Sequence, residues 1–247
     1  VVDKIAEATK RPLKSIIGDG AFLKSLKPAN FADAEFGIPT VTDIIAALYD
    51  GVLRVSKPED PERDRFVLAK GHAMLAVYAA LFLKGWLTQE ALNTYCGDGT
   101  MLGVHPEYGL RGVDFASGSL GQGLSMAAGA ALAARLQQSP RRAFALLSDA
   151  ECNEGSVWEA IMFAAHHQLS NLIAIVDLNG QQALGYTDQV LSLRPMTERW
   201  RAFGWDVHEV DGHNVGALQE TIAALDTAVG PPHVLIARTT FGKGVSY

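Results

Sequence analysis

Cysteine is scarce in this chain of 247 residues, and its scarcity limits what the protein can be. Only Cys96 and Cys152 are present, which is too few for a disulfide framework, and their spacing fits no metal-ligand pattern. The first residues also lack a basic segment followed by an apolar run, so the pattern of a signal peptide is missing. A reducing, cytoplasmic location is expected.

Long hydrophobic runs and concentrated positive charge are missing too. No stretch of about 18 apolar residues lacks charged or turn residues, so no membrane span is expected. The net charge is −6 and the basic residues are scattered, which argues against a nucleic-acid-binding surface. An apolar fraction of 48% is typical of a packed protein, and the length fits a single domain over residues 1–247.

The spacing of apolar residues changes near residue 140. Before it, residues 42–54, 72–84 and 121–137 have helical spacing, and the polar segment 57–65 is expected to be a surface loop. After it, apolar runs predict strands, and helical patterns separate them; the strands are expected at 144–147, 172–178, 205–210 and 233–238, and the helices at 154–168, 195–203 and 214–228. We therefore expect an α/β fold, with a helical part at about 1–140 and a βα core at about 141–247 whose parallel sheet is covered by helices on both faces.

Two oxygen-bearing side chains follow successive predicted strands. Asp149 comes shortly after the run 144–147, and Asn179 comes directly after the run 172–178. Both are expected at the edge of the sheet where α/β proteins bind ligands. A carboxylate and an amide oxygen suit Mg²⁺ or Ca²⁺, which often takes further ligands from phosphates.

Spacing alone leaves a simpler alternative open. Asp149 is also suited to capping a helix, and Asn179-Gly180 to forming an ordinary turn. Literal Gly-Asp-Gly sequences occur at 18–20 and 97–99, but neither follows a buried strand, so no site is expected there.

Four ordered blocks of sequence resemble transketolases. Residues 147–185 are similar to the thiamine-diphosphate motif of that family, which usually opens with Gly-Asp-Gly and closes on Asn. The other blocks are Lys70-Gly71-His72-Ala73, Gly103-Val104-His105-Pro106-Glu107 and the run 117–123, and residues 237–247 resemble the last strand and loop. The resemblance extends from about residue 42 onward, and it implies a three-layer thiamine-diphosphate-binding fold.

The resemblance also implies a role for each matched residue. The divalent metal would be held by Asp149, Asn179 and the carbonyl of Gln181. The cofactor would contact His72, Gly118, Leu120, Asp149, Ala150, Asn179 and Lys243. His105 would contact the substrate near the reacting carbon, and Glu154 and Glu159 would link paired active sites by proton relay.

Each of these residues has a structural alternative. His72 is also suited to capping its helix, His105 to a surface loop, and Glu159 to a paired position at an interface. The remaining histidines carry no functional expectation; these are His166, His167, His208, His213 and His233.

The chain is similar to only the first part of full-length transketolases. Those proteins continue through a pyrimidine-binding domain and a third domain, so the resemblance implies the N-terminal subunit of a split enzyme. A second chain would carry the missing domains, with two copies of each chain in the complex. The implied reaction transfers a two-carbon ketol unit from a ketose or 2-oxo donor to an aldehyde or ketone.

Two alternatives remain open, namely one chain of a 2-oxo-acid-decarboxylating ligase, or a scaffold chain without turnover. A nicotinamide-binding domain is disfavoured, because no buried strand leads into Gly-x-Gly-x-x-Gly. Ser148 and Ala150 replace the two motif glycines, and Glu35 stands where the family has a substrate-binding His, so an unusual substrate is expected. The family also uses a late His near the diphosphate, and this sequence ends before it, at Tyr247.

Overall fold

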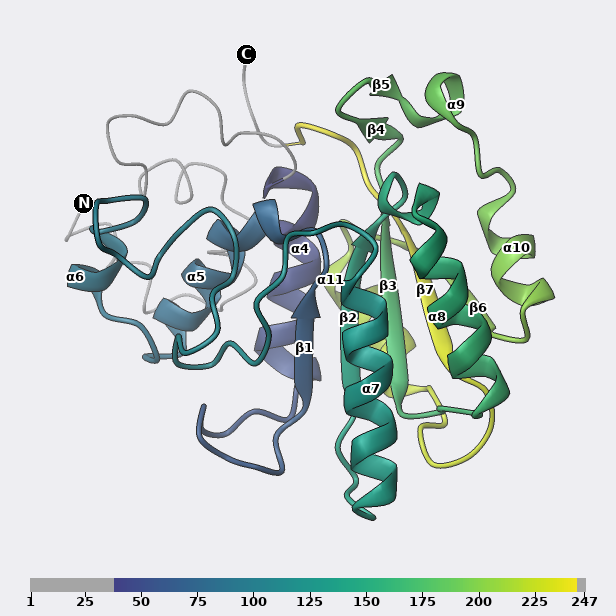
Figure 1. Ribbon diagram of the computed structural model, residues 1–247, viewed down its shortest axis with the longest axis horizontal. Helices are drawn as coiled ribbons and strands as arrows, with labels where there is room; N and C mark the ends of the chain where they lie inside the picture. Colours follow the sequence, from purple (N-terminus) through teal and green to yellow (C-terminus); the bar gives the residue numbers. More distant parts are fainter. Residues whose placement is uncertain (1–37, 244–247) are drawn as a thin grey trace.

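A computed structural model describes residues 38–243 of the chain. Five parallel strands form the main sheet in the order β1-β2-β3-β7-β6. The bounds of these strands are β1 (Arg65–Leu68), β2 (Ala143–Ser148), β3 (Leu172–Leu178), β6 (Asp206–Asp211) and β7 (His233–Arg238). Helices lie on both faces of the sheet, which makes three layers (Figure 1). The α/β class and the covered parallel sheet predicted from the sequence are therefore confirmed.

Successive side chains of each strand point to opposite faces of the sheet, and each face packs into its own hydrophobic core. On one face, Leu68, Phe144 and Ile175 pack against α4 (Ile38–Ala47), α5 (Met74–Leu83) and α11 (Val215–Ala223). On the other, Val67, Leu147 and Val176 pack against α7 (Gly123–Leu136), α8 (Gly155–His166) and α10 (Met196–Ala202). β2 is buried at every position and β3 at all but its last, because each of these central strands is covered on both sides.

The direction of each crossover decides which face its helix covers. From β1 through β2 and β3 to β6 the chain moves one way across the sheet, and α7, α8 and α10 lie on one face. From β6 the chain returns to β7, between β3 and β6, and α11 lies on the opposite face. Right-handed crossovers require this change of face when the direction reverses.

The predicted strands and helices are confirmed with small shifts in their bounds. The helix expected at 42–54 begins at Ile38 and continues beyond Ala47 as a π-helical turn, η1 (Leu48–Val52). The helix expected at 72–84 begins with a 3₁₀ turn, η2 (Gly71–Ala73). Smaller elements complete the structure, namely α6 (Gln89–Leu92), η3 (Glu151–Asn153), β4 (Gln181–Gln182), β5 (Gly185–Tyr186) and α9 (Thr187–Val190). Among the described residues, no helix combines the length and hydrophobicity needed to cross a membrane.

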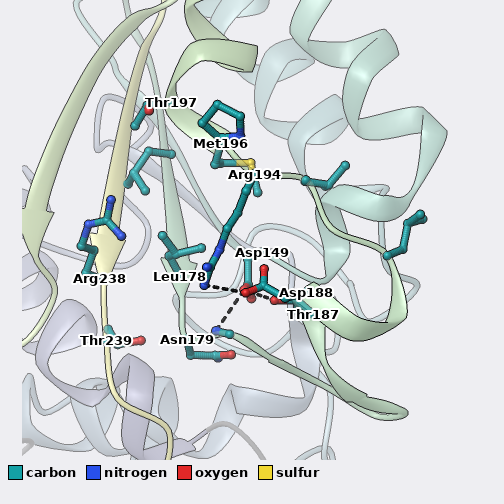
Figure 2. Close-up of a pocket in the computed structure, with 15 residues that line it drawn as sticks. Asp149, Leu178, Asn179, Thr187, Asp188, Arg194, Met196, Thr197, Arg238 and Thr239 are labelled. Carbon is teal, nitrogen blue, oxygen red and sulfur yellow. Dashed lines mark hydrogen bonds and ion pairs between the residues drawn. The ribbon is translucent and has the colours of Figure 1, made fainter.

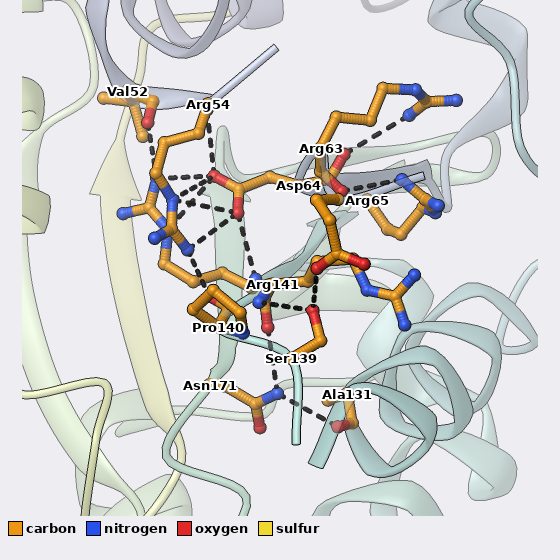
Figure 3. A network of polar contacts seen from close by, with 12 residues as sticks. Val52, Arg54, Arg63, Asp64, Arg65, Ala131, Ser139, Pro140, Arg141 and Asn171 are labelled. Atoms are coloured by element: carbon orange, nitrogen blue, oxygen red, sulfur yellow. Dashed lines mark hydrogen bonds and ion pairs between the residues drawn. The ribbon is translucent and has the colours of Figure 1, made fainter. Parts of the chain in front are cut away.

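The segment 57–65 is only partly the surface loop predicted from its polar sequence. Asp64 is buried, and it accepts hydrogen bonds from the backbone amides and guanidinium groups of Arg54 and Arg142 (Figure 3). Arg63 is also buried, and its guanidinium donates two hydrogen bonds of 2.7 and 2.6 Å to the carboxylate of Asp114. The segment then runs into β1, so the part expected to be helical contributes an edge strand to the sheet.

Candidate functional site

Asp149 follows the last residue of β2, at the carboxyl edge of the sheet. Its Oδ2 accepts hydrogen bonds from the Gly180 amide at 3.0 Å and the Thr187 hydroxyl at 3.3 Å. Its Oδ1 accepts from the Ala150 amide at 3.0 Å. The turn after β3 therefore lies directly beside Asp149, because β2 and β3 pair in parallel with Ser148 opposite Asp177.

The carboxyl of Asp149 carries a poorly compensated charge. Only 3% of the residue is exposed, and its hydrogen-bond donors among residues 38–243 are neutral. The pKa of Asp149 is raised to about 6, mainly by burial; the negative charge of Asp177 contributes to the rise, and the hydrogen bond from Gly180 opposes it. A cation bound here would relieve the cost of burying this charge.

Asn179 begins the turn that meets Asp149. Its Oδ1 accepts from the Gln181 amide at 2.9 Å, and its Nδ2 donates to Asp177 Oδ2 at 3.1 Å. These two bonds fix the rotamer and identify the oxygen end of the amide. The turn needs Gly180, whose φ of 74° is strained for side-chain-bearing residues.

A buried ion pair lies beneath this turn. Lys70 Nζ is 2.7 Å from Asp177 Oδ2, and both side chains are at most 2% exposed. Asp177 also accepts from the hydroxyls of Thr40 and Thr239 and from Asn179. Burial opposes the ionisation of Asp177, but the charge and hydrogen bond of Lys70 outweigh it and hold the pKa of this carboxyl below its usual value.

Lys70 also lies next to a group of residues from the blocks 70–73, 103–107 and 117–123. His72 follows it in η2, and His105 packs against Gly71 and Gly118. A Cβ on Gly118 would lie 2.5 Å from the His105 ring, so only glycine leaves room for the imidazole there. Burial, together with the charges of Lys70 and His105, lowers the pKa of His72 to about 4, so the ring is neutral at physiological pH.

Two residues important to this arrangement were not assigned roles from the sequence. Asp177 interrupts the apolar run of β3, which was the available signal that a buried charge needed a partner. Glu151 is fully buried in η3; its Oε1 accepts from Gly121 N at 2.8 Å, while its Oε2 has no hydrogen-bond partner among the described residues. Burial raises the pKa of Glu151 to about 7.

The other predicted site residues lie at more open positions. Glu154 and Glu159, at the start and on the surface of α8, are exposed, as is His105. Leu120 is 40% exposed, and it is one of several large apolar side chains at the surface of the described residues. Ala150 and Gln181 are half-buried beside Asp149 and Asn179, and Lys243 is exposed beyond β7.

A pocket of about 540 Å³ opens beside Asp149. It is lined from the turn after β3, the end of β7 and the segment 187–197 (Figure 2). Figure 2 shows Arg194 reaching toward Asp188, which it meets at 2.8 Å, close to Asp149. The pocket therefore joins an apolar wall to acidic, amide and guanidinium groups.

Several predicted features lie outside the described residues. These are Glu35 with the segment 34–37, the Gly-Asp-Gly at 18–20, and the end of the chain at Tyr247. The second Gly-Asp-Gly, at 97–99, lies in a turn between α6 and α7 and does not directly follow a strand.

Comparison with known proteins identifies the family. The family model described as "Transketolase, thiamine diphosphate binding domain" matches residues 36–247. A second model, of an HHH domain, matches residues 1–51, most of which precede Ile38. The chain is 41% identical over 207 residues to an apulose-4-phosphate transketolase subunit of Phocaeicola vulgatus, covering 83% of this chain and 74% of that protein.

A second relative and a solved structure agree. The chain is 41% identical over 214 residues to 6-deoxy-6-sulfo-D-fructose transketolase subunit SqwG of a Clostridium species, covering 85% of this chain and 78% of that protein. The crystal structure of transketolase from Campylobacter jejuni superposes with a TM-score of 0.78 at 27% identity, over 94% of this chain and 37% of that one.

Three findings agree on the transketolase family. They are the match to a thiamine-diphosphate-binding family model, the relatives named as single transketolase subunits, and the shared fold. Relatives named as one subunit imply that a partner subunit exists. The chain thus belongs to the transketolase family and corresponds to the thiamine-diphosphate-binding, N-terminal subunit of a split enzyme.

Proposed function

We propose that this chain holds the diphosphate and metal of thiamine diphosphate in a transketolase-type transferase. The enzyme would move a two-carbon ketol unit from a ketose or 2-oxo donor to an aldehyde or ketone acceptor. The observation that carries the proposal is Asp149, a buried carboxylate with neutral donors, directly beside the turn that begins with Asn179. Such a carboxylate is stable only when a cation joins it or a proton neutralises it.

The residues present fit a divalent metal. Asp149 and the Asn179 amide oxygen would be side-chain ligands, and the carbonyl of Gln181 would be a third. Oxygen ligands of this kind suit Mg²⁺, which leaves its other positions to diphosphate and water. The bond from Asn179 Nδ2 to Asp177 supports this role, because it leaves the amide oxygen end for the metal.

The cofactor's diphosphate would lie between this metal and the loop that carries His72. A neutral imidazole donates one N–H, which an oxygen of the diphosphate would accept. The small residues Gly118 and Ala150 would allow close backbone approach, Leu120 would give apolar contact, and Lys243 would approach from the segment after β7. When bound, thiamine diphosphate supplies the carbon nucleophile that breaks and re-forms the C–C bond.

The exposed residues would act toward substrate and partner. His105 would donate a hydrogen bond to an oxygen beside the reacting carbon of the substrate. Glu154 and Glu159 would face the second chain and carry protons between paired sites. That chain would supply the pyrimidine-binding and C-terminal domains, with two copies of each chain in a cytoplasmic heterotetramer and residues 1–247 as one domain of it.

The test is calorimetry of the chain with its partner, titrated with thiamine diphosphate and Mg²⁺. We expect cofactor binding that requires both the metal and Asp149, followed by ketol transfer in the complex. Product analysis with a ketose phosphate or pyruvate as donor then separates ketol transfer from 2-oxo-acid chemistry. Absence of cofactor binding even in the complex would show a scaffold chain instead.

A further inference from the structure

Two histidines and an aspartate meet at the opposite end of the sheet from Asp149. Asp206 and His233 are the first residues of β6 and β7, and they pair directly across the two strands. His208 is two residues beyond Asp206 on β6, so it points to the same face. The cluster therefore lies at the amino edge of the sheet, whereas the proposed cofactor site lies at the carboxyl edge.

The ligand atoms of these side chains converge on one point. Oδ2 of Asp206 lies 3.0 Å from Nε2 of His208 and 3.1 Å from Nδ1 of His233. All three atoms are within 4.8 Å of one another. The His233 side chain is 4% exposed, while those of His208 and Asp206 are 30% and 47% exposed, so the group is anchored on one side and open to water on the other.

The contacts of His233 place its Nδ1, a hydrogen-bond acceptor in the neutral ring, beside a carboxylate that can also only accept. Nε2 lies 2.9 Å from the carbonyl oxygen of Asp226, which can only accept, so Nε2 carries the proton. In a neutral imidazole Nδ1 then presents a lone pair to the carboxylate of Asp206. Two acceptors at 3.1 Å repel each other unless a cation or a second proton lies between them.

We propose that Asp206, His208 and His233 bind a divalent transition-metal ion of the Zn²⁺ type. Two imidazole nitrogens and one carboxylate oxygen are a ligand set that Zn²⁺ accepts readily, with water as the fourth ligand. Bonds of about 2.0–2.1 Å in a tetrahedron separate ligand atoms by about 3.3–3.4 Å. The two separations from Asp206 Oδ2 to the histidine nitrogens would therefore open by only a few tenths of an ångström, and the two histidine nitrogens, which lie within 4.8 Å of each other, would adjust to the same separation.

The surroundings of the cluster support this assignment. The bond from His233 Nε2 to a backbone carbonyl is the contact that commonly orients a metal-bound histidine. A metal here would join edge strand β6 to β7 and, through His233, to the segment that holds Asp226.

The test uses the full chain, freed of metal by a chelator and titrated with ZnCl₂ and, separately, CoCl₂. We expect one equivalent of Zn²⁺ to bind and raise Tm, and Co²⁺ to give the visible absorption of a tetrahedral site. His208→Ala should abolish both signals, because it removes one ligand from a half-exposed position without disturbing the core. His166→Ala, on the exposed surface of α8, is the matched control and should bind Zn²⁺ as the wild type does.

Two results would overturn the proposal. One is absence of Zn²⁺ binding in the wild type, with both ring nitrogens of His233 protonated by NMR, which would make the cluster a simple ion pair. The other is Zn²⁺ binding that persists unchanged in His208→Ala, which would place the ion elsewhere. Asp149→Ala should retain the Zn²⁺ site, so the outcome is independent of the proposed cofactor site.

Discussion

Two buried aspartates at opposite ends of the sheet differ in their partners. Asp64, just before β1, accepts hydrogen bonds from the guanidinium groups of Arg54 and Arg142. Asp149, just after β2, accepts only from neutral groups among the described residues. Burial opposes the ionisation of Asp64, but its arginines hold the pKa of that carboxyl below its usual value, whereas burial raises the pKa of Asp149 to about 6.

Asp64 therefore contributes to the stability of the fold, whereas Asp149 lacks a counter-ion among the described residues. The amino end of β1 and β2 compensates its buried charge within the chain, so that end is complete. The carboxyl end leaves Asp149 uncompensated, at a cost to stability that a bound cation would remove. Functional sites commonly retain such locally unfavourable arrangements.

Asp177 lies at the carboxyl end but follows the pattern of Asp64. It has Lys70 as an internal counter-ion, and its hydrogen bonds position the turn that holds Asn179. Within one edge, then, one carboxylate is neutralised by the chain, and the other has no counter-ion among the described residues. Four predictions test this contrast, from the largest effect to the smallest.

Asp149→Ala should abolish ketol transfer by the complex, with a loss on the order of a thousandfold or more, because the metal loses a charged ligand. The variant should remain folded, since no cationic partner is left unpaired. Steady-state activity with saturating cofactor, together with circular dichroism, measures both effects. Full activity in this variant would remove Asp149 from the site.

Asp64→Asn should lower the free energy of unfolding by about 3 kcal/mol, because two arginines lose a buried counter-ion. The folded variant should still bind cofactor. Urea unfolding measures the effect, and Glu59→Gln is the matched control from the same segment, since Glu59 meets Arg111 on the exposed surface and its loss should matter little. Equal effects of the two substitutions would contradict the role of burial.

Lys70→Met should weaken metal-dependent cofactor binding by about 10- to 100-fold. Asp177 would lose its counter-ion, and it would then no longer hold the side chain of Asn179 in place. The double variant Lys70→Met/Asp177→Leu distinguishes positioning from simple stability. It should recover much of the lost Tm, since no buried charge remains unpaired, but not the cofactor affinity measured by calorimetry. Recovery of both would show that the ion pair is purely structural.

Mg²⁺ affinity should fall about tenfold per pH unit below pH 6, because the metal must then displace a proton from Asp149. The sign follows from the raised pKa: the metal-free folded chain gains stability from the protonated carboxyl at low pH and loses it as pH rises through about 6. Asp149→Asn should therefore be more stable than the metal-free wild type at pH 7. Calorimetry and thermal unfolding between pH 5 and 8 measure both trends, and a flat wild-type profile would contradict them.

The fold was largely predictable from local sequence. The runs that became β2, β3 and β7 are mainly apolar, and helices such as α8 have apolar residues at helical spacing. The exception is β1, which has only four residues and follows a polar, proline-containing segment. Short strands next to charged residues give little signal, because the charge of Arg65 masks the pattern until its neighbours are known.

The site was predictable in part. Motif resemblance led to His72, His105, Gly118, Asp149 and Asn179, and the structure brings the first three together and sets Asp149 against the turn of Asn179. Their roles toward metal and cofactor stay predictions. Lys70 was part of a quoted motif, but nothing in its own segment indicated that its partner was Asp177.

The sequence by itself determined the order of strands and helices along the chain, and with it the arrival of Asp149 and Asn179 at one edge of a parallel sheet. Only the tertiary structure decided which buried charges are compensated. Lys70 and Asp177 are 107 residues apart, and Asp64 and Arg142 are 78 apart. Electrostatic energy depends on distance in space and on the loss of water, and neither is determined until the strands have paired.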